Sequence, residues 1–261
     1  MGKTPFFSVL VPTYNQAQYL GQALDSLLAQ ADSDWEAVVV NDGSTDSTSQ
    51  VLETYSRSDR RFRVLHKQNG GVASALNAGL REARGEWICW LSSDDLFDRR
   101  KLIVHREWIA RDPNCRFFFT NSRLLNDVTG SFKDTWLSIP RDPKLQVLEM
   151  LRLNYVHGNS ICVHRDAWSQ AGVFNEELRY AQDYDMWLRL LALYPATFIP
   201  ERTCITREHA LQETKTFPQA TRFDSAKAAI NFINQHNFYL SFEAHFKTPA
   251  ARRYRRGCLG A

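Results

Sequence analysis

The strongest constraint on the fold is a regular alternation of apolar and amphipathic stretches over the first hundred residues. Short runs rich in β-branched and aromatic residues, typical of buried strands, occupy 6–12, 35–40, 61–66 and 86–91. The stretches between them repeat apolar residues at helical spacing, over 16–30, about 48–56 and 69–83. Strands that alternate with helices pair in parallel through right-handed crossovers. The sequence therefore predicts an α/β fold with a mostly parallel, Rossmann-like sheet and helices on both of its faces.

Polar segments directly follow three of these strands. They read "PTYN" at 12–15, "NDGSTD" at 41–46 and "SSDD" at 92–95. Parallel strands present their carboxyl ends along one edge of the sheet, and doubly wound sheets bind ligands at that edge. We therefore expect these three segments to meet in space and to form a ligand site.

The second half of the chain lacks the regular alternation of strands and helices. Its expected elements are a helix at about 99–111, an aromatic strand at 115–121, a helix near 143–153, a strand at 159–165, a helix at 184–194 and an amphipathic helix at 223–246. No Gly/Ser-rich linker separates the two halves. We expect one continuous sheet with the second half built onto it.

Composition excludes several classes of protein. A net charge of +3, from 32 basic and 29 acidic residues, is too small to favour nucleic-acid binding. The five cysteines show no CxxC spacing, which with the absence of a signal peptide favours the reducing cytoplasm. No apolar run has membrane-spanning length. A basic cluster near the C-terminus is either a solvated tail or a patch for an anionic membrane surface; it comprises Arg252, Arg253, Arg255 and Arg256.

Acidic residues at the strand ends have two interpretations each. Asp42, before Gly-Ser, suits an Asx-turn or helix cap, or a carboxylate that accepts hydrogen bonds from a ligand. The adjacent Asp94 and Asp95 suit a helix N-terminus, or a Mg²⁺ or Mn²⁺ ion shared with substrate phosphates. A zinc site is not expected, because His-rich and Cys-rich ligand sets are absent from the sequence.

Two further candidates lie in the second half. Asp183, at the start of an expected helix, suits either a capping role or a general base near a reacting hydroxyl. His209, a lone histidine in "REHALQET", suits a surface or structural position as well as a ligand position.

These segments together resemble a known family. The chain is similar to the family 2 glycosyltransferases of GT-A fold, which are inverting nucleotide-sugar transferases. The resemblance is carried, in order along about 7–195, by "SVLVPTYNQAQYLGQALDSLLAQ", "VVVNDGSTDST", "NGGVASALNAGLREARGEWICWLSSDD" and "GVFNEELRYAQDYDMWLRL".

The resemblance implies roles for individual residues. The nucleotide would be bound by Pro12, Thr13, Tyr14, Asn15, Asp42, Asn69 and Asp94. Asp95 and His209 would bind the metal, and Asp183 would be the catalytic base. The acceptor would contact His157, Asn159, Trp187 and the loop that carries Trp136. The chain departs from the family at two positions, because Gln182 replaces a common Glu and Leu76 a common Arg.

The resemblance also implies an activity and an organisation. The expected enzyme moves a sugar from a nucleoside-diphosphate sugar, UDP-sugar in particular, to a hydroxyl of a glycan or lipid-linked saccharide, with Mn²⁺ or Mg²⁺. It would serve cell-envelope polysaccharide synthesis from the cytoplasm, with a peripheral contact to the inner face of the membrane. Residues 1–98 would bind the donor, 99–215 the acceptor, and 216–261 would form a helical extension.

Two other functions use similar parts. A sugar-phosphate nucleotidyltransferase also combines an α/β sheet with Mg²⁺-binding acids, but it would usually carry a Gly-rich basic loop after the first strand, and "VPTYNQAQ" has neither feature. A dinucleotide-binding domain would open its first helix with GxGxxG, which is absent. A nucleotide-sugar or carbohydrate-binding module without catalytic activity is the non-enzymatic alternative.

Overall fold

The structure is a computed structural model that describes residues 4–235, apart from 138, 141, 211 and 213–215. The first half contains β1 (Phe7–Thr13), α1 (Ala17–Leu28), β2 (Trp35–Asp42), α2 (Thr48–Ser58), β3 (Phe62–Lys67), α3 (Val72–Glu82), β4 (Trp87–Trp90) and β5 (Leu96–Phe97). The second half contains α4 (Lys101–Arg111), β6 (Phe117–Asn126), β7 (Phe132–Asp134), α5 (Pro143–Arg152), the 3-10 turn η1 (Gly158–Ser160), β8 (Cys162–His164), α6 (Arg165–Ala171), α7 (Gln182–Leu193), β9 (Ala196–Glu208) and α9 (Pro218–Gln235).

One nine-stranded sheet runs through both halves, in the order β3-β2-β1-β4-β8-β6-β9-β5, with β7 attached to β6. The first four strands pair in parallel, as the alternating pattern predicted. Every residue of β1 and β2 is buried, which is characteristic of parallel strands covered on both faces. From β8 onward the strands run in mixed directions, and β6 pairs in parallel with β9. The expected α/β fold and the continuous sheet are confirmed.

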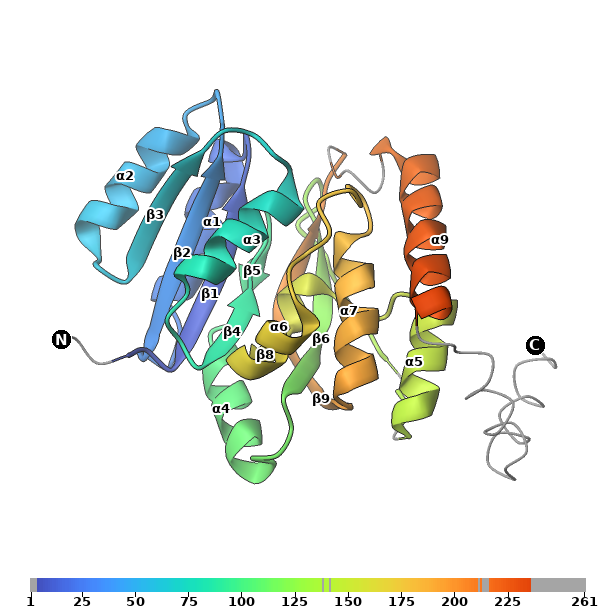
Figure 1. Cartoon of the computed structure of the whole chain (residues 1–261). Coiled ribbons are helices and arrows are strands. Elements are labelled where there is room, and N and C mark those ends of the chain that lie inside the picture. The colour runs from blue at the N-terminus through green and yellow to red at the C-terminus, as the bar shows by residue number, and fades with distance from the viewer. Residues whose placement is uncertain (1–3, 138, 141, 211, 213–215, 236–261) are drawn as a thin grey trace, which may run out of the picture.

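Two apolar cores cover the two faces of the sheet (Figure 1). One core joins the sheet to α3, α5, α6, α7 and α9. The other joins it to α1, α4 and Leu52 of α2. The three polar segments lie at the carboxyl ends of β1, β2 and β4.

Trp187 corrects one expectation from the sequence. Its side chain is 0 % exposed and packs among Trp90, Phe117, Trp168 and Phe174, with ring centroids 5.9–6.4 Å apart. Helical periodicity predicted that Trp187 lies on an apolar face of its helix. In the structure this face of α7 packs against the apolar core. It cannot contact an acceptor, so that assignment was wrong.

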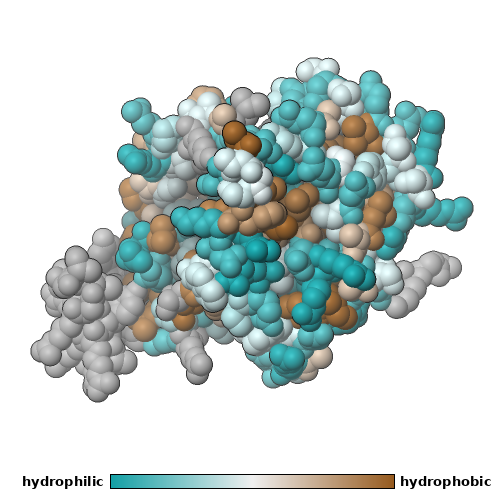
Figure 2. Space-filling view, turned by 180° about the vertical axis from the view of Figure 1, so that it is seen from behind, coloured by the Kyte–Doolittle hydropathy of each residue, from teal (hydrophilic) through white to brown (hydrophobic). Residues whose placement is uncertain are grey.

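The end of the chain is only partly described. Helix α9 begins at Pro218, earlier than the expected 223, and packs on the core through Ala228 and Phe232. Residues 236–246 of the expected helix lie outside the described residues, and so does the arginine cluster at 252–256. Among the described residues, none of the helices combines the length and apolar character of a membrane span. Figure 2 shows the apolar residues of one face in separate patches among hydrophilic ones.

Candidate active site

A cleft of ≈ 850 Å³ lies at the carboxyl ends of β1, β2 and β4. Most residues that the sequence singled out line it together, namely Pro12, Thr13, Tyr14, Asn15, Asp42, Asn69, Asp94, Asp95, His157 and Asp183. Within the described part of the chain, Asn159, Trp187 and His209 are not among the lining residues. Parallel pairing predicted that the three strand-end segments of the first half would meet, and the structure adds His157 and Asp183 of the second half to the same cleft.

Asn15 ties the first two polar loops together. It has a left-handed backbone conformation (φ 51°), and its side-chain oxygen accepts a hydrogen bond of 2.8 Å from the Thr45 N–H. Its own N–H donates to the Ser44 hydroxyl at 3.0 Å. Gly43 allows the second of these loops to approach the loop after β3, because a Cβ at Gly43 would lie 2.7 Å from the backbone nitrogen of Asn69. This corner of the cleft is thus held in place by hydrogen bonds between side chains and backbone groups of the two loops.

Asp42 is a buried carboxylate with defined donors. It accepts hydrogen bonds from the Lys67 ammonium at 2.5 Å, the Gly71 N–H at 2.7 Å and the Gly70 N–H at 3.1 Å. The two glycine N–H groups belong to the N-terminal end of α3, whose dipole favours a negative charge. Asp42 therefore holds the Gly70-Gly71 turn that leads into α3 and also forms part of the cleft wall.

Asp95 is the more buried of the two adjacent acids. Its Oδ1 accepts a 2.7 Å hydrogen bond from the Arg207 N–H, and its Oδ2 accepts one from the side-chain amide of Asn159. Burial, together with the neighbouring Asp94 carboxylate, raises the pKa of Asp95 to about 8. The repulsion inherent in two adjacent carboxylates is thus met by a backbone N–H and an amide, contributed by distant parts of the chain.

Asp94 and His209 form a pair that differs from the expected one. The Nε2 atom of His209 lies 3.0 Å from Asp94 Oδ2, and the imidazole packs on Tyr19 with ring centroids 5.0 Å apart. The sequence grouped His209 with Asp95 as metal ligands, whereas the structure places it against Asp94. Within this pair the side chain of Asp94 is 21 % exposed and that of His209 only 4 %. The assignment of Asp95 and His209 as metal ligands stays a prediction.

Arg207 is a site residue that the sequence did not indicate. Besides its N–H bond to Asp95, its guanidinium donates to the backbone oxygen of Asp94 at 3.0 Å, to Asp127 at 2.7 Å and to Gln22 at 2.7 Å. It thereby links β9 and α1 to the acidic pair. Its partners lie 80–185 residues away along the chain, so no local pattern could reveal it.

Asp183 lies in the first turn of α7, on the wall of the cleft. Its Oδ1 accepts a 2.7 Å hydrogen bond from the Tyr184 N–H, and its Oδ2 accepts one of 3.3 Å from the side-chain amide of Asn154. Burial raises the pKa of Asp183 above its usual range. A half-buried carboxylate with a raised pKa can accept a proton from a bound hydroxyl.

Doubly wound α/β sheets bind their ligands at the carboxyl ends of the strands, and the cleft with its carboxylates lies at that edge. Residues 8–170 match the family described as Glycosyl transferase family 2, and the chain belongs to that family. It is 35% identical over 217 residues to an uncharacterized glycosyltransferase of Rickettsia felis, covering 81% of this chain and 35% of the relative. It is 31% identical to the putative teichuronic acid biosynthesis glycosyltransferase TuaG of Bacillus subtilis, over 72% of each chain. The chain thus spans about a third of the length of the Rickettsia felis protein.

Solved structures confirm the GT-A fold. The structure of S. aureus TarS 1-349 in complex with UDP-GlcNAc superposes with a TM-score of 0.65 at 21% identity, over 88% of this chain and 72% of that one. A mannosyltransferase from Pyrobaculum calidifontis, PcManGT, in complex with GDP-Man and Mn2+, superposes with a TM-score of 0.59 at 20% identity, over 98% and 80%. At these identities the similarity establishes the fold.

Proposed function

We propose that the protein transfers a sugar from a nucleoside-diphosphate sugar, UDP-sugar in particular, to a hydroxyl of a glycan or lipid-linked saccharide, with inversion at the anomeric carbon. One observation carries the proposal: a single cleft holds the strand-end segments of the first half and Asp183 of the second. Binding groups for a nucleotide and a carboxylate suited to proton transfer are therefore within reach of one bound donor.

The nucleotide would occupy the corner formed by the first two loops. Tyr14 is 47% exposed there and can stack on a base, and the Asp42 carboxylate lies in the same wall. The complex of TarS with UDP-GlcNAc supports a uridine donor, and the name of TuaG supports a role in cell-envelope polysaccharide synthesis. A membrane contact through the arginines at 252–256 stays a prediction.

A divalent cation fits the acidic pair. Mg²⁺ and Mn²⁺ are commonly held by one or two carboxylates plus substrate phosphates, so a protein cage of three ligands is not required, and the described residues contain no such cluster. Burial first, and then the neighbouring Asp94 carboxylate, raises the pKa of Asp95, and a bound cation would favour the ionised forms of both acids. Asp94 and Asp95 would hold the ion, with His209 beside Asp94. When bound, it would neutralise charge on the leaving diphosphate.

Proton transfer would be the task of Asp183. An Oδ atom of Asp183 takes the proton of the acceptor hydroxyl while that oxygen attacks the anomeric carbon. The bond between that carbon and the diphosphate oxygen breaks on the opposite face, so one displacement inverts the centre. Asn154 orients the carboxylate through its amide, and His157 lies in the same wall where the acceptor would enter.

A nucleotide screen tests donor binding. UDP with Mn²⁺ is expected to raise the melting temperature by about 5–10 °C at a hundredfold excess over its Kd, because a ligand that binds only the folded chain stabilises it. GDP and dTDP with Mn²⁺, and each nucleotide without metal, serve as comparisons. Asp94→Asn should reduce the metal-dependent part of the shift.

Release of UDP from a UDP-sugar separates an enzyme from a binding module, because a pure binder releases none. A chain that neither binds any of the three nucleotides nor releases one from its sugar conjugate contradicts the proposed function.

The pH dependence of transfer provides a second test. Asp183 must be ionised to accept a proton, so kcat is expected to fall as the pH drops through its pKa. Since burial raises that pKa, the acidic limb should lie above the usual aspartate value of 3.8. The residual rate of an Asp183→Asn variant should lack this limb. If the unmodified protein and the Asp183→Asn variant show the same acidic limb, that limb belongs to another titrating group.

A further inference from the structure

A second cavity of ≈ 370 Å³ lies apart from the cleft and shares no lining residue with it. It is formed by the start of α4 and by strands β6, β7 and β9. Arg123 of β6 lines this cavity, whereas its neighbour Leu124 lines the cleft. Because successive side chains of a strand point to opposite faces, the two cavities occupy opposite sides of the sheet.

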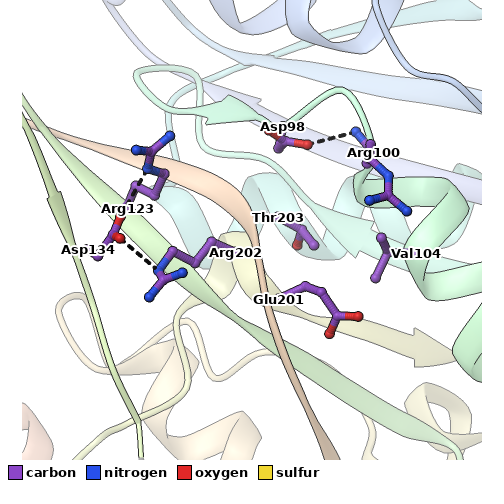
Figure 3. A pocket seen from close by; sticks show the side chains of 8 residues that line it. All are labelled: Asp98, Arg100, Val104, Arg123, Asp134, Glu201, Arg202 and Thr203. Carbon is purple, nitrogen blue, oxygen red and sulfur yellow. Dashed lines mark hydrogen bonds and ion pairs between the residues drawn. The ribbon is translucent and has the colours of Figure 1, made fainter.

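The polar groups of this cavity are balanced in charge. Three guanidinium groups and three carboxylates line it, from Arg100, Arg123, Arg202, Asp98, Asp134 and Glu201. Figure 3 shows Asp134 between Arg123 and Arg202, with Arg100 on the side of α4. A simple anion would gain three donors but would also face three carboxylates. The wall therefore suits a neutral ligand that both donates and accepts hydrogen bonds.

Two buried nitrogens of Arg202 in this wall lack hydrogen-bond acceptors in the part of the chain that the structure describes. Asp134 accepts from Arg123 Nε at 3.1 Å, but its distance of 3.5 Å to Arg202 Nε is that of an ion pair without a hydrogen bond. Among the described residues, Nε and Nη2 of Arg202 have no hydrogen-bond partner. Buried donors without acceptors cost free energy, which a ligand oxygen would recover after a small side-chain movement.

Trp136 provides an aromatic surface beside these groups. The guanidinium of Arg202 lies 3.9 Å from the centroid of its indole, yet the Trp136 side chain remains 74% exposed. Trp136 is not among the residues that line the cavity, but its contact with Arg202, which is one of them, places the indole next to that wall. An exposed indole next to planar polar side chains offers an apolar surface and directional hydrogen bonds to the same ligand.

We propose that this cavity is a saccharide-binding subsite. The hydroxyls of a sugar ring donate to carboxylates such as Glu201 and Asp134 and accept from Arg202 and Arg123, while a C–H face packs on Trp136. The volume lies at the small end of the roughly 300–1,000 Å³ found for small-molecule sites.

The role of the subsite rests on the proposed function. It holds a unit of the acceptor glycan remote from the sugar that reacts in the cleft. Holding a remote part of a chain raises the effective concentration of its reactive end, so acceptors long enough to reach both sites bind better than short ones.

Direct binding of defined oligosaccharides tests the proposal. The probes are chitopentaose, maltoheptaose, and octasaccharides of hyaluronan and chondroitin, with inorganic phosphate as a simple anion. Titration calorimetry and tryptophan fluorescence report binding to the full chain. At least one saccharide is expected to bind in the millimolar range, and Trp136→Ala or Arg202→Gln should each weaken it by about five- to tenfold.

Matched controls are available on the surface. Phe223→Ala removes an aromatic side chain of 72% exposure, and Arg57→Gln removes a guanidinium of 78% exposure, both outside the cavity. Both controls should bind like the unmodified protein. The proposal is overturned if no probe saccharide binds, if the cavity variants bind as well as the controls, or if only phosphate binds.

The outcome is independent of the proposed function, because the binding measurement uses no nucleotide. Release of UDP from UDP-sugars, measured on the same cavity variants, should be unchanged. Saccharide binding without any nucleotide release would contradict the proposed transferase function and support the subsite. Nucleotide release without saccharide binding would support the transferase function and contradict the subsite.

Discussion

An Asp183→Asn variant is expected to bind UDP like the unmodified protein and to transfer sugar about 10²–10⁴-fold more slowly. The amide has nearly the shape of the carboxylate and can keep the hydrogen bond from the Tyr184 N–H through its oxygen. It cannot accept the acceptor's proton. The defect should therefore appear in kcat, measured with saturating donor, while the melting-temperature shift caused by UDP and Mn²⁺ remains.

Asp185→Asn provides the matched control for this experiment. Asp185 lies in the same first turn of α7 but forms an ion pair of 2.7 Å with Arg189, away from the cleft-lining residues. It should change turnover little. If Asp183→Asn retains full turnover, Asp183 is not the base and the proposed mechanism fails, whatever the donor.

A Trp187→Ala variant is expected to lose about 3–5 kcal/mol of folding free energy, because it removes a fully buried indole from an aromatic core. For a chain of this size, that corresponds to a fall of roughly 6–20 °C in melting temperature. The loss arises from a cavity between α7 and the sheet. Thermal unfolding followed by circular dichroism measures it directly.

Trp187→Phe keeps most of the volume and should cost less than the alanine variant. Trp136→Ala, at a position of 74% exposure, should leave the melting temperature nearly unchanged. An unaltered melting temperature for Trp187→Ala would contradict the packing described for α7 and would restore its candidacy as an acceptor contact.

Local patterns predicted most of the elements. The runs at 35–40 and 61–66 became β2 and β3, and the helical spacing at 99–111 became α4. Strand β9 was not among the expected elements, because Pro200 and several charged residues interrupt its apolar pattern. Helix α6 is only seven residues long, too short for a periodicity to be recognised.

Burial and pairing were harder to predict than element type. Periodicity indicated an apolar face around Trp187 but not what would cover it, and α6 and the sheet decided that. Arg207 gave no signal, since it acts on a carboxylate that lies 112 residues away. A side chain's role in such contacts depends on the path of the whole chain.

The amino-acid sequence alone determined where the cleft lies, because parallel strands must bring "PTYN", "NDGSTD" and "SSDD" to one edge of the sheet. Only the tertiary structure decided how Asp94 and Asp95 divide their roles. The physical reason is that the local sequence gives two neighbouring carboxylates the same surroundings. Their surroundings differ only because the end of β9 and the residue after it pack against them. There the Arg207 N–H binds Asp95 and the His209 imidazole binds Asp94, over separations of 112 and 115 residues.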